Sequence, residues 1–212
     1  MAPCPTNALA VNFKDFSAII YTDKDGLVSW LNFEGPESKS PEAQYTLHNA
    51  ISADKKGNIV AYEGQLALIM YHHESKAHEV NFRLYYIQKG PVTDADGSTS
   101  PDRHVRELCA THRFDHLKAG KPLEWSRYDP KDPKATAATL TPSAFDKKRY
   151  ISARSSPLAA ICGNKAIRVY FQKEGSNDAL SVAYADYEKG SCLVQKPSLF
   201  EWKDRVAYSG SF

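Results

Sequence analysis

A threefold repetition of short strand-like segments is the feature that most constrains how this chain can fold. Each repeat holds a short apolar segment, a turn, a segment rich in β-branched and aromatic residues, a second turn and an alternating third segment. The strands that this order predicts cover residues 7–13, 17–23, 27–33, 65–73, 81–88, 104–111, 156–163, 166–172 and 179–186. The sequence therefore predicts an all-β chain made of three small antiparallel units.

The residues within and between these segments favour strands. In AIRVYFQ, the apolar residues Ile167, Val169 and Phe171 occupy every second position, which is the period of a strand with two different faces. Residues 101–120 also show apolar positions at helical spacing, but they fill the third-strand place of the repeat, so a strand is predicted there. The turns hold dipeptides that tolerate positive φ angles, namely Asp25-Gly26, Asp96-Gly97 and Gly175-Ser176.

Two stretches interrupt the repeat. Residues 89–103 are rich in Gly, Pro, Ser and Asp, and a long surface loop is predicted for them. Residues 126–155 are predicted to supply a fourth strand and a connection.

Three units of three or four antiparallel strands are typical of β-propeller blades. We expect a single domain over 1–212, with blades at about 7–50, 58–128 and 150–206. A closed propeller has roughly four to eight blades, and three blades leave open strand edges that invite aggregation. We therefore expect a homodimer in which two chains complete a six-bladed ring.

The composition argues against several classes of protein. Lys and Arg total 27 against 25 Asp and Glu, for a net charge of +2, so a nucleic-acid partner is not expected. No apolar run approaches the ~20 residues of a membrane span, and MAPCPTNALAVNF has neither a basic nor a long apolar part, so a cytoplasmic protein is expected. The four cysteines form no C-x-x-C pair, and no cofactor motif occurs, so no metal or cofactor is predicted.

The segment SPLAAI, followed by IRVYFQ, resembles a blade of the fungal fucose-specific lectin family. The resemblance implies a six-bladed propeller whose blades each hold an Arg, a Glu and an aromatic residue. In that family the Arg and Glu bind sugar hydroxyls, and the aromatic ring stacks on the sugar face. A fork of donors, a pair of acceptors and an apolar surface suit that task.

Carried over residue by residue, the resemblance leaves one complete set, in the second unit. That unit keeps Arg83 in FRLYY and Glu107 in HVRE, and Trp125 is its candidate aromatic residue. Two interpretations of Arg83 and Glu107 stay open. They form a structural ion pair, or they line a pocket in which Glu107 accepts a proton and Arg83 stabilises an oxyanion.

The other two units depart from the pattern. The third unit keeps Arg168 and offers Trp202, but Val182 stands near the place of the acid. The first unit has Ala18 in place of the Arg. Only one set per chain is therefore complete.

Four further residues are candidates for a ligand site. His72 and His73 follow LALIMY, and alternation turns one of them inward and the other outward. They are either surface histidines, or the inward one is a proton donor near neutral pH. Tyr85 and Tyr170 either fill the core or form the wall of a pocket for a small molecule.

Two functions are compatible with these residues. The first, favoured by a small margin because two sets are incomplete, is a cofactor-free enzyme of fungal secondary metabolism on a lectin-like scaffold. Such an enzyme is similar to the hetero-Diels–Alderases of tropolone–sesquiterpenoid pathways. The similarity implies a guided cycloaddition. It also implies dehydration of a benzylic alcohol to a quinone methide, for which Arg83, Glu107 and a nearby histidine are the candidates. The alternative is a carbohydrate-binding lectin with one surviving fucose site per chain.

Overall fold

A computed structural model of the chain describes most of the predicted strands. The described residues are 7–13, 16–33, 45–48, 51, 59–73, 76–93, 97–113, 123, 125, 143–163, 166–176, 179–186 and 201–208. Within these residues every regular element is a β-strand except one 3-10 turn, η2 (Asp146–Lys148). The predicted all-β fold is confirmed, including the strand expected over 104–111.

The first sheet has the strand order β1-β2-β3-β4 and is antiparallel throughout. Its strands are β1 (Asn7–Phe13), β2 (Phe16–Thr22), β3 (Val28–Phe33) and β4 (Tyr45–His48). A tight turn joins β2 to β3, where the Asp23 carboxylate accepts hydrogen bonds from the backbone N–H groups of Asp25 and Leu27, both at 2.9 Å. This turn fixes the register of the hairpin.

The third sheet repeats this plan at the other end of the chain, with the order β10-β11-β12-β13. Its strands are β10 (Leu158–Cys162), β11 (Ala166–Gln172), β12 (Leu180–Asp186) and β13 (Trp202–Tyr208). The alternation seen in AIRVYFQ is confirmed, because Ile167, Val169 and Phe171 are fully buried on one face of β11.

The middle sheet departs from the expected four strands. Among the described residues it has three, in the order β5-β6-β9, with β5 (Ala61–His73), β6 (Lys76–Gln88) and β9 (Val105–Arg113). Residues of the segment 143–152 occupy the outer edge of β9 instead. The carbonyl of Tyr150 accepts the N–H of Val105 at 2.8 Å, and a carboxylate oxygen of Asp146 accepts the N–H of Glu107 at 2.8 Å.

The predicted loop over 89–103 contains regular structure. It holds a two-stranded ribbon, β7 (Val92–Thr93) paired with β8 (Thr99–Ser100), between β6 and β9. The rest of the described segment is a surface loop as predicted, and the ribbon was missed because a two-residue strand gives too short a pattern to show a period.

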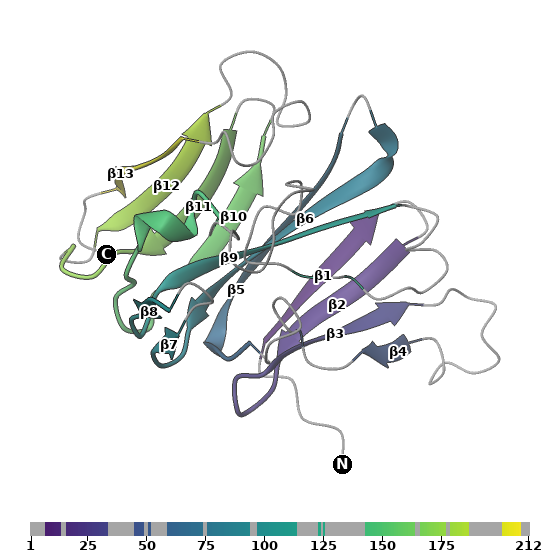
Figure 1. The fold of residues 1–212 in the computed structure, drawn as a ribbon, viewed down its shortest axis with the longest axis horizontal. Coiled ribbons are helices and arrows are strands. Elements are labelled where there is room, and N and C mark those ends of the chain that lie inside the picture. Colours follow the sequence, from purple (N-terminus) through teal and green to yellow (C-terminus); the bar gives the residue numbers. More distant parts are fainter. Residues whose placement is uncertain are drawn as a thin grey trace.

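The three sheets lie face to face, with the middle sheet between the other two (Figure 1). The first strand of each sheet lies at the centre, since β5 contacts β1 on one side and β10 on the other. This is how successive propeller blades are arranged. The middle sheet is buried on both faces: Phe82, Leu84 and Tyr86 pack toward the first sheet, and Tyr85 and Ile87 toward the third.

Gly26 shows how closely the first and middle sheets approach. Its φ is +86°, and its carbonyl accepts the N–H of Ala61 at 2.8 Å. A Cβ atom at this position would lie 2.3 Å from the carbonyl oxygen of Ala61. Gly97 has a similar φ of +81°, but a Cβ atom there would meet nothing within 4 Å.

These two glycines give a matched test of the contact between the sheets. Gly97→Ala should lower the free energy of unfolding by about 1–2 kcal/mol, the cost of a left-handed conformation. Gly26→Ala should cost about 3 kcal/mol or more, because the backbone of Ala61 must also move. Urea denaturation of the two variants measures the difference, and equal losses would show that the β2–β3 turn does not rest on β5.

Candidate functional site

Arg83 and Glu107 lie side by side on adjacent strands and form a buried ion pair. Arg83 on β6 is opposite Cys109, and Glu107 on β9 is opposite Tyr85, so the two side chains are diagonal neighbours on one face of the middle sheet. Nη1 of Arg83 lies 2.5 Å from Oε1 of Glu107, and each residue is only 1% exposed. The face is the one that packs against the third sheet.

Two tyrosine hydroxyls add hydrogen bonds to this pair. Nε of Arg83 donates to the Tyr71 hydroxyl at 3.0 Å, and the Tyr85 hydroxyl donates to Oε1 of Glu107 at 2.8 Å. Burial, reinforced by the Glu107 carboxylate, raises the pKa of Tyr85 well above its ordinary value, so this phenol stays protonated. Burial alone would lower the pKa of Arg83, but Glu107, Tyr71, Cys109 and Tyr85 together outweigh that effect and raise it, so the guanidinium stays charged.

Aromatic rings from two further segments surround Tyr85. The ring of Phe145, just before η2, lies 5.2 Å from the ring of Tyr85, centroid to centroid, and the ring of Trp202 on β13 lies 6.5 Å away. Phe145 and Trp202 also contact each other edge to face at 4.8 Å. The ion pair therefore lies beside an apolar wall that belongs to the third sheet and to the segment before it.

A second buried ion pair supports the backbone of the first. Nε of Arg106 donates to Oδ2 of Asp146 at 2.9 Å, and the other oxygen of Asp146 accepts the N–H of Glu107 at 2.8 Å. Arg106 also donates to Oε1 of Gln88 at 3.2 Å. Burial raises the pKa of Asp146 to about 6, although Arg106 and the N–H of Glu107 both oppose that rise. The Asp146 carboxyl group thereby fixes the backbone of β9 at Glu107.

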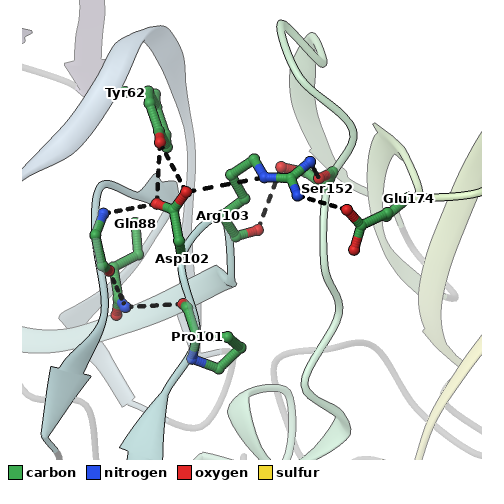
Figure 2. A network of polar contacts seen from close by, with 8 residues as sticks. Tyr62, Gln88, Pro101, Asp102, Arg103, Ser152 and Glu174 are labelled. Atoms are coloured by element: carbon green, nitrogen blue, oxygen red, sulfur yellow. Dashed lines mark hydrogen bonds and ion pairs between the residues drawn. The ribbon is translucent and has the colours of Figure 1, made fainter.

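A polar network joins the middle and third sheets at the Gln88 end of β6 (Figure 2). Both carboxylate oxygens of Asp102 accept hydrogen bonds from the Tyr62 hydroxyl, at 3.0 and 2.9 Å. The neighbouring Arg103 donates to Glu174 at 2.5 Å and to the carbonyl of Ser152 at 3.1 Å. We call this network the clasp. It ties the turn before β9 to the turn after β11.

The structure brings together only some of the residues that the sequence singled out. Arg83, Glu107, Tyr85 and Trp202 meet at the interface of the middle and third sheets. Trp125 is buried in the core between the first and middle sheets, edge to face with Phe82 at 6.4 Å, and so lies on the other side of the middle sheet from the ion pair.

Four other candidates lie apart from this cluster. Arg168 and Tyr170 are half-buried on the face of β11 that turns away from the middle sheet. His72 and His73 end β5, and their side chains lie outside the described residues. The roles predicted for all four stay predictions.

Sequence reasoning missed three contributors to the cluster. Tyr71 could have been predicted from the sequence, because it is two residues after Ile69 on β5 and so lies on the same face of the strand. Ile69 is opposite Arg83. Phe145 and Asp146 carry none, since they precede or begin a single 3-10 turn with no repeating pattern.

Two kinds of feature are absent from the described residues. No group of three or more His, Cys, Asp or Glu side chains is placed to hold a metal ion there. In the same part of the chain, no helix is long and apolar enough to cross a membrane.

Comparisons with known proteins find similarity only among solved structures. No protein-family model and no curated protein matches the chain. AofleA from Arthrobotrys oligospora matches with 15% identity and a TM-score of 0.47 over 96% of this chain and 41% of its own, and a triple mutant of it matches with 14% identity and the same TM-score and coverage. A mutant Aleuria aurantia lectin in complex with Fucα1-6GlcNAc matches with 11% identity and a TM-score of 0.49 over 97% of this chain and 49% of its own. The chain thus spans less than half the length of these proteins.

The raised pKa of Asp146 predicts how stability depends on pH. The folded carboxyl holds its proton up to about pH 6, whereas in the unfolded chain it ionises near the ordinary value of 3.8. The folded state therefore binds more protons between these limits, so this contribution is complete at low pH and is lost as the pH rises to 6. The two-unit shift corresponds to about 3 kcal/mol.

Asp146→Asn supplies the comparison, because the amide cannot ionise. The free energy of unfolding of the wild type, minus that of Asp146→Asn, should fall as the pH rises from 4 to 6 and stay flat above. Denaturant titrations at several pH values measure it. A difference that rises over this range would mean that the carboxylate is the stabilised form in the folded chain.

Proposed function

We propose that the chain is a carbohydrate-binding protein with one site per chain, centred on Arg83 and Glu107. The observation that carries the proposal is the Arg83–Glu107 ion pair, with a tyrosine hydroxyl on each partner and the rings of Phe145 and Trp202 beside it. A guanidinium donates, a carboxylate accepts, and phenols do both. Neighbouring hydroxyls of a sugar need this combination, and the C–H face of a sugar packs well on aromatic rings.

The equivalent positions of the other two sheets support a single site. The register places Ala18 of the first sheet where Arg83 stands in the middle sheet, with Val11 across the strand pair where Ile69 lies. In the third sheet Arg168 is kept, but Val182 is opposite Tyr170, where the middle sheet has Glu107 opposite Tyr85. Each of these positions lacks either the donor or the acceptor.

Binding at this site requires the interface to open. Arg83 and Glu107 are each 1% exposed and hydrogen bond directly to each other, so a sugar hydroxyl would have to insert between them. The ring of Trp202 lies within contact of Tyr85, which itself bonds to Glu107. Ligand binding should therefore change the fluorescence of Trp202.

The test measures binding of fucosylated glycans on an array, and of methyl fucoside by calorimetry. Removing one member of a buried ion pair costs about 3–5 kcal/mol of stability, whereas replacing both with apolar residues is often tolerated. The informative variant is therefore the double substitution Arg83→Met with Glu107→Leu. Its binding should fall at least tenfold, because hydrogen bonds to charged groups contribute about 1.5–3 kcal/mol each.

Arg168→Met is the matched control, because Arg168 occupies the position of Arg83 in a sheet that lacks the acid. It should bind like the wild type. Circular dichroism and denaturation must show that both variants are folded. Full binding by the folded double variant would place the site elsewhere, and absence of glycan binding by the wild type would refute the lectin function.

A second function, a cofactor-free enzyme that guides a cycloaddition, is favoured by one observation. The ion pair is almost fully withdrawn from water beside aromatic rings, and donors and acceptors act more strongly in such surroundings. In the dehydration of an ortho-hydroxybenzyl alcohol, Glu107 would take the phenol proton and return it to the departing hydroxyl, which leaves as water. Arg83 would stabilise the phenolate oxygen, and the quinone methide would then meet its alkene partner in a fixed orientation.

The enzyme function predicts asymmetric product from a quinone methide precursor and an electron-rich alkene. The wild type should form one enantiomer in excess, and Glu107→Gln should slow formation by about 10²–10⁴-fold, the usual contribution of a general base. Chiral chromatography measures both results. Racemic product at the uncatalysed rate from the wild type would eliminate this function and leave the lectin function standing.

A further inference from the structure

We infer that two copies of this chain assemble, with the open face of the third sheet of each copy packed on the open face of the first sheet of its twin. The third-sheet outer face is defined by Ala159, Ile161, Arg168, Tyr170, Val182 and Tyr184. The first-sheet outer face is defined by Ala8, Ala10, Ile19, Ser29 and Leu31. Both faces are assigned by register, because the alternate residues of the same strands lie in the two cores.

Part of the third-sheet outer face is apolar and accessible, beside the half-buried Arg168 and the buried Val182. Ile161 is 49% exposed and is one of two large hydrophobic residues that are exposed in the described part of the chain. Ala159 beside it on β10 is also exposed. Tyr184 is half-buried, and the guanidinium of Arg205 lies over its ring at 5.2 Å. The exposed side chains of Ala159 and Ile161 are the part of this face that a second sheet would cover.

The positions of Ile161, Arg168 and Tyr184 in the third sheet have counterparts in the middle sheet that another sheet of the chain covers. In the middle sheet, Ile69 is opposite Arg83, which is in turn opposite Cys109. In the third sheet, Ile161 is opposite Arg168, which is in turn opposite Tyr184. The middle-sheet set packs against the third sheet. The third-sheet outer face thus repeats a surface that this chain already covers with one of its own sheets.

The first-sheet outer face has the matching place in the repeat. Ala10 is opposite Ile19 on β1 and β2, as Ala160 is opposite Val169 on β10 and β11. Ala160 packs against the core that contains Ile69, the middle-sheet counterpart of Ile161, and β10 contacts β5. By the same register, Ala10 of one copy should meet Ile161 of the other.

The occupant that fits is a second copy and not an unrelated partner. The five side chains that define the first-sheet outer face are uncharged, and Ala8 and Ala10 are small and exposed, so another sheet can approach closely. Each chain has one face of each kind. In two copies related by a twofold axis, each third-sheet outer face packs on the first-sheet outer face of the other copy. All four faces are then covered, and no further copy can be added. The inference does not depend on any ligand.

The mass of the protein in solution, measured by light scattering during gel filtration, is the first test. The wild type should show twice the chain mass of 23.6 kDa. Ile161→Glu and Ala10→Glu should each reduce it to the monomer, although they lie at opposite ends of the chain, because each places a charge in the same interface.

Val206→Glu is the matched control for Ile161→Glu. Val206 is the other exposed large hydrophobic residue, at 55%, and lies on the same sheet, but it shares the face of Trp202 four residues earlier. This variant should remain a dimer. Circular dichroism must show that every variant is folded.

A charge pair then tests which positions meet. Ile161→Glu combined with Ala10→Lys in one chain should restore the dimer, because each interface of the closed pair would then hold opposite charges. A wild-type protein that is monomeric or trimeric overturns the inference. Dissociation of Val206→Glu to the same extent as Ile161→Glu overturns the assignment of the face, and failure of the charge pair to restore the dimer overturns the proposed register.

Discussion

Burial of the middle sheet on both faces is the constraint on which the rest of the structure depends. All residues from Val80 to Gln88 on β6 are buried, so this part of the strand has no face toward water. A charged residue on such a strand must find its counter-charge inside the protein. Arg83 pairs with Glu107, and Arg106 on the neighbouring strand pairs with Asp146. The polar cluster therefore exists because two sheets enclose a third, and its geometry is fixed by strand register.

The segment 143–150 couples this cluster to the edge of the sheet. Asp146 takes the place of a backbone acceptor on the outer edge of β9 and neutralises Arg106 at the same time. Phe145, the residue before it, packs on the ring of Tyr85. One short turn thus positions the backbone of Glu107 and also supplies part of the apolar wall. The proposed site is consequently built from the middle sheet, the third sheet and the segment between them.

The strands were predictable from the sequence to a greater extent than the site. A period of two and Gly-containing turns are local signals, and they located β1, β2, β3, β11 and β12 to within about two residues. Adjacent strands also predict that Arg83 and Glu107 are neighbours. The surroundings of the pair depend on contacts that have no local signal: Trp125 packs on the opposite side of the middle sheet, and Asp146 replaces a strand that the repeat led us to expect. Both follow from how sheets stack.

The clasp at the Gln88 end of β6 determines how the middle and third sheets can separate. Arg103 bonds to Glu174 and to the carbonyl of Ser152, and Asp102 holds Tyr62, so the two sheets are fastened to each other at that end. The first strands of both sheets are also joined along the centre, where β5 contacts β10. In the proposed carbohydrate-binding function, the opening that admits a sugar to Arg83 would therefore begin at the corner of the two sheets farthest from both attachments.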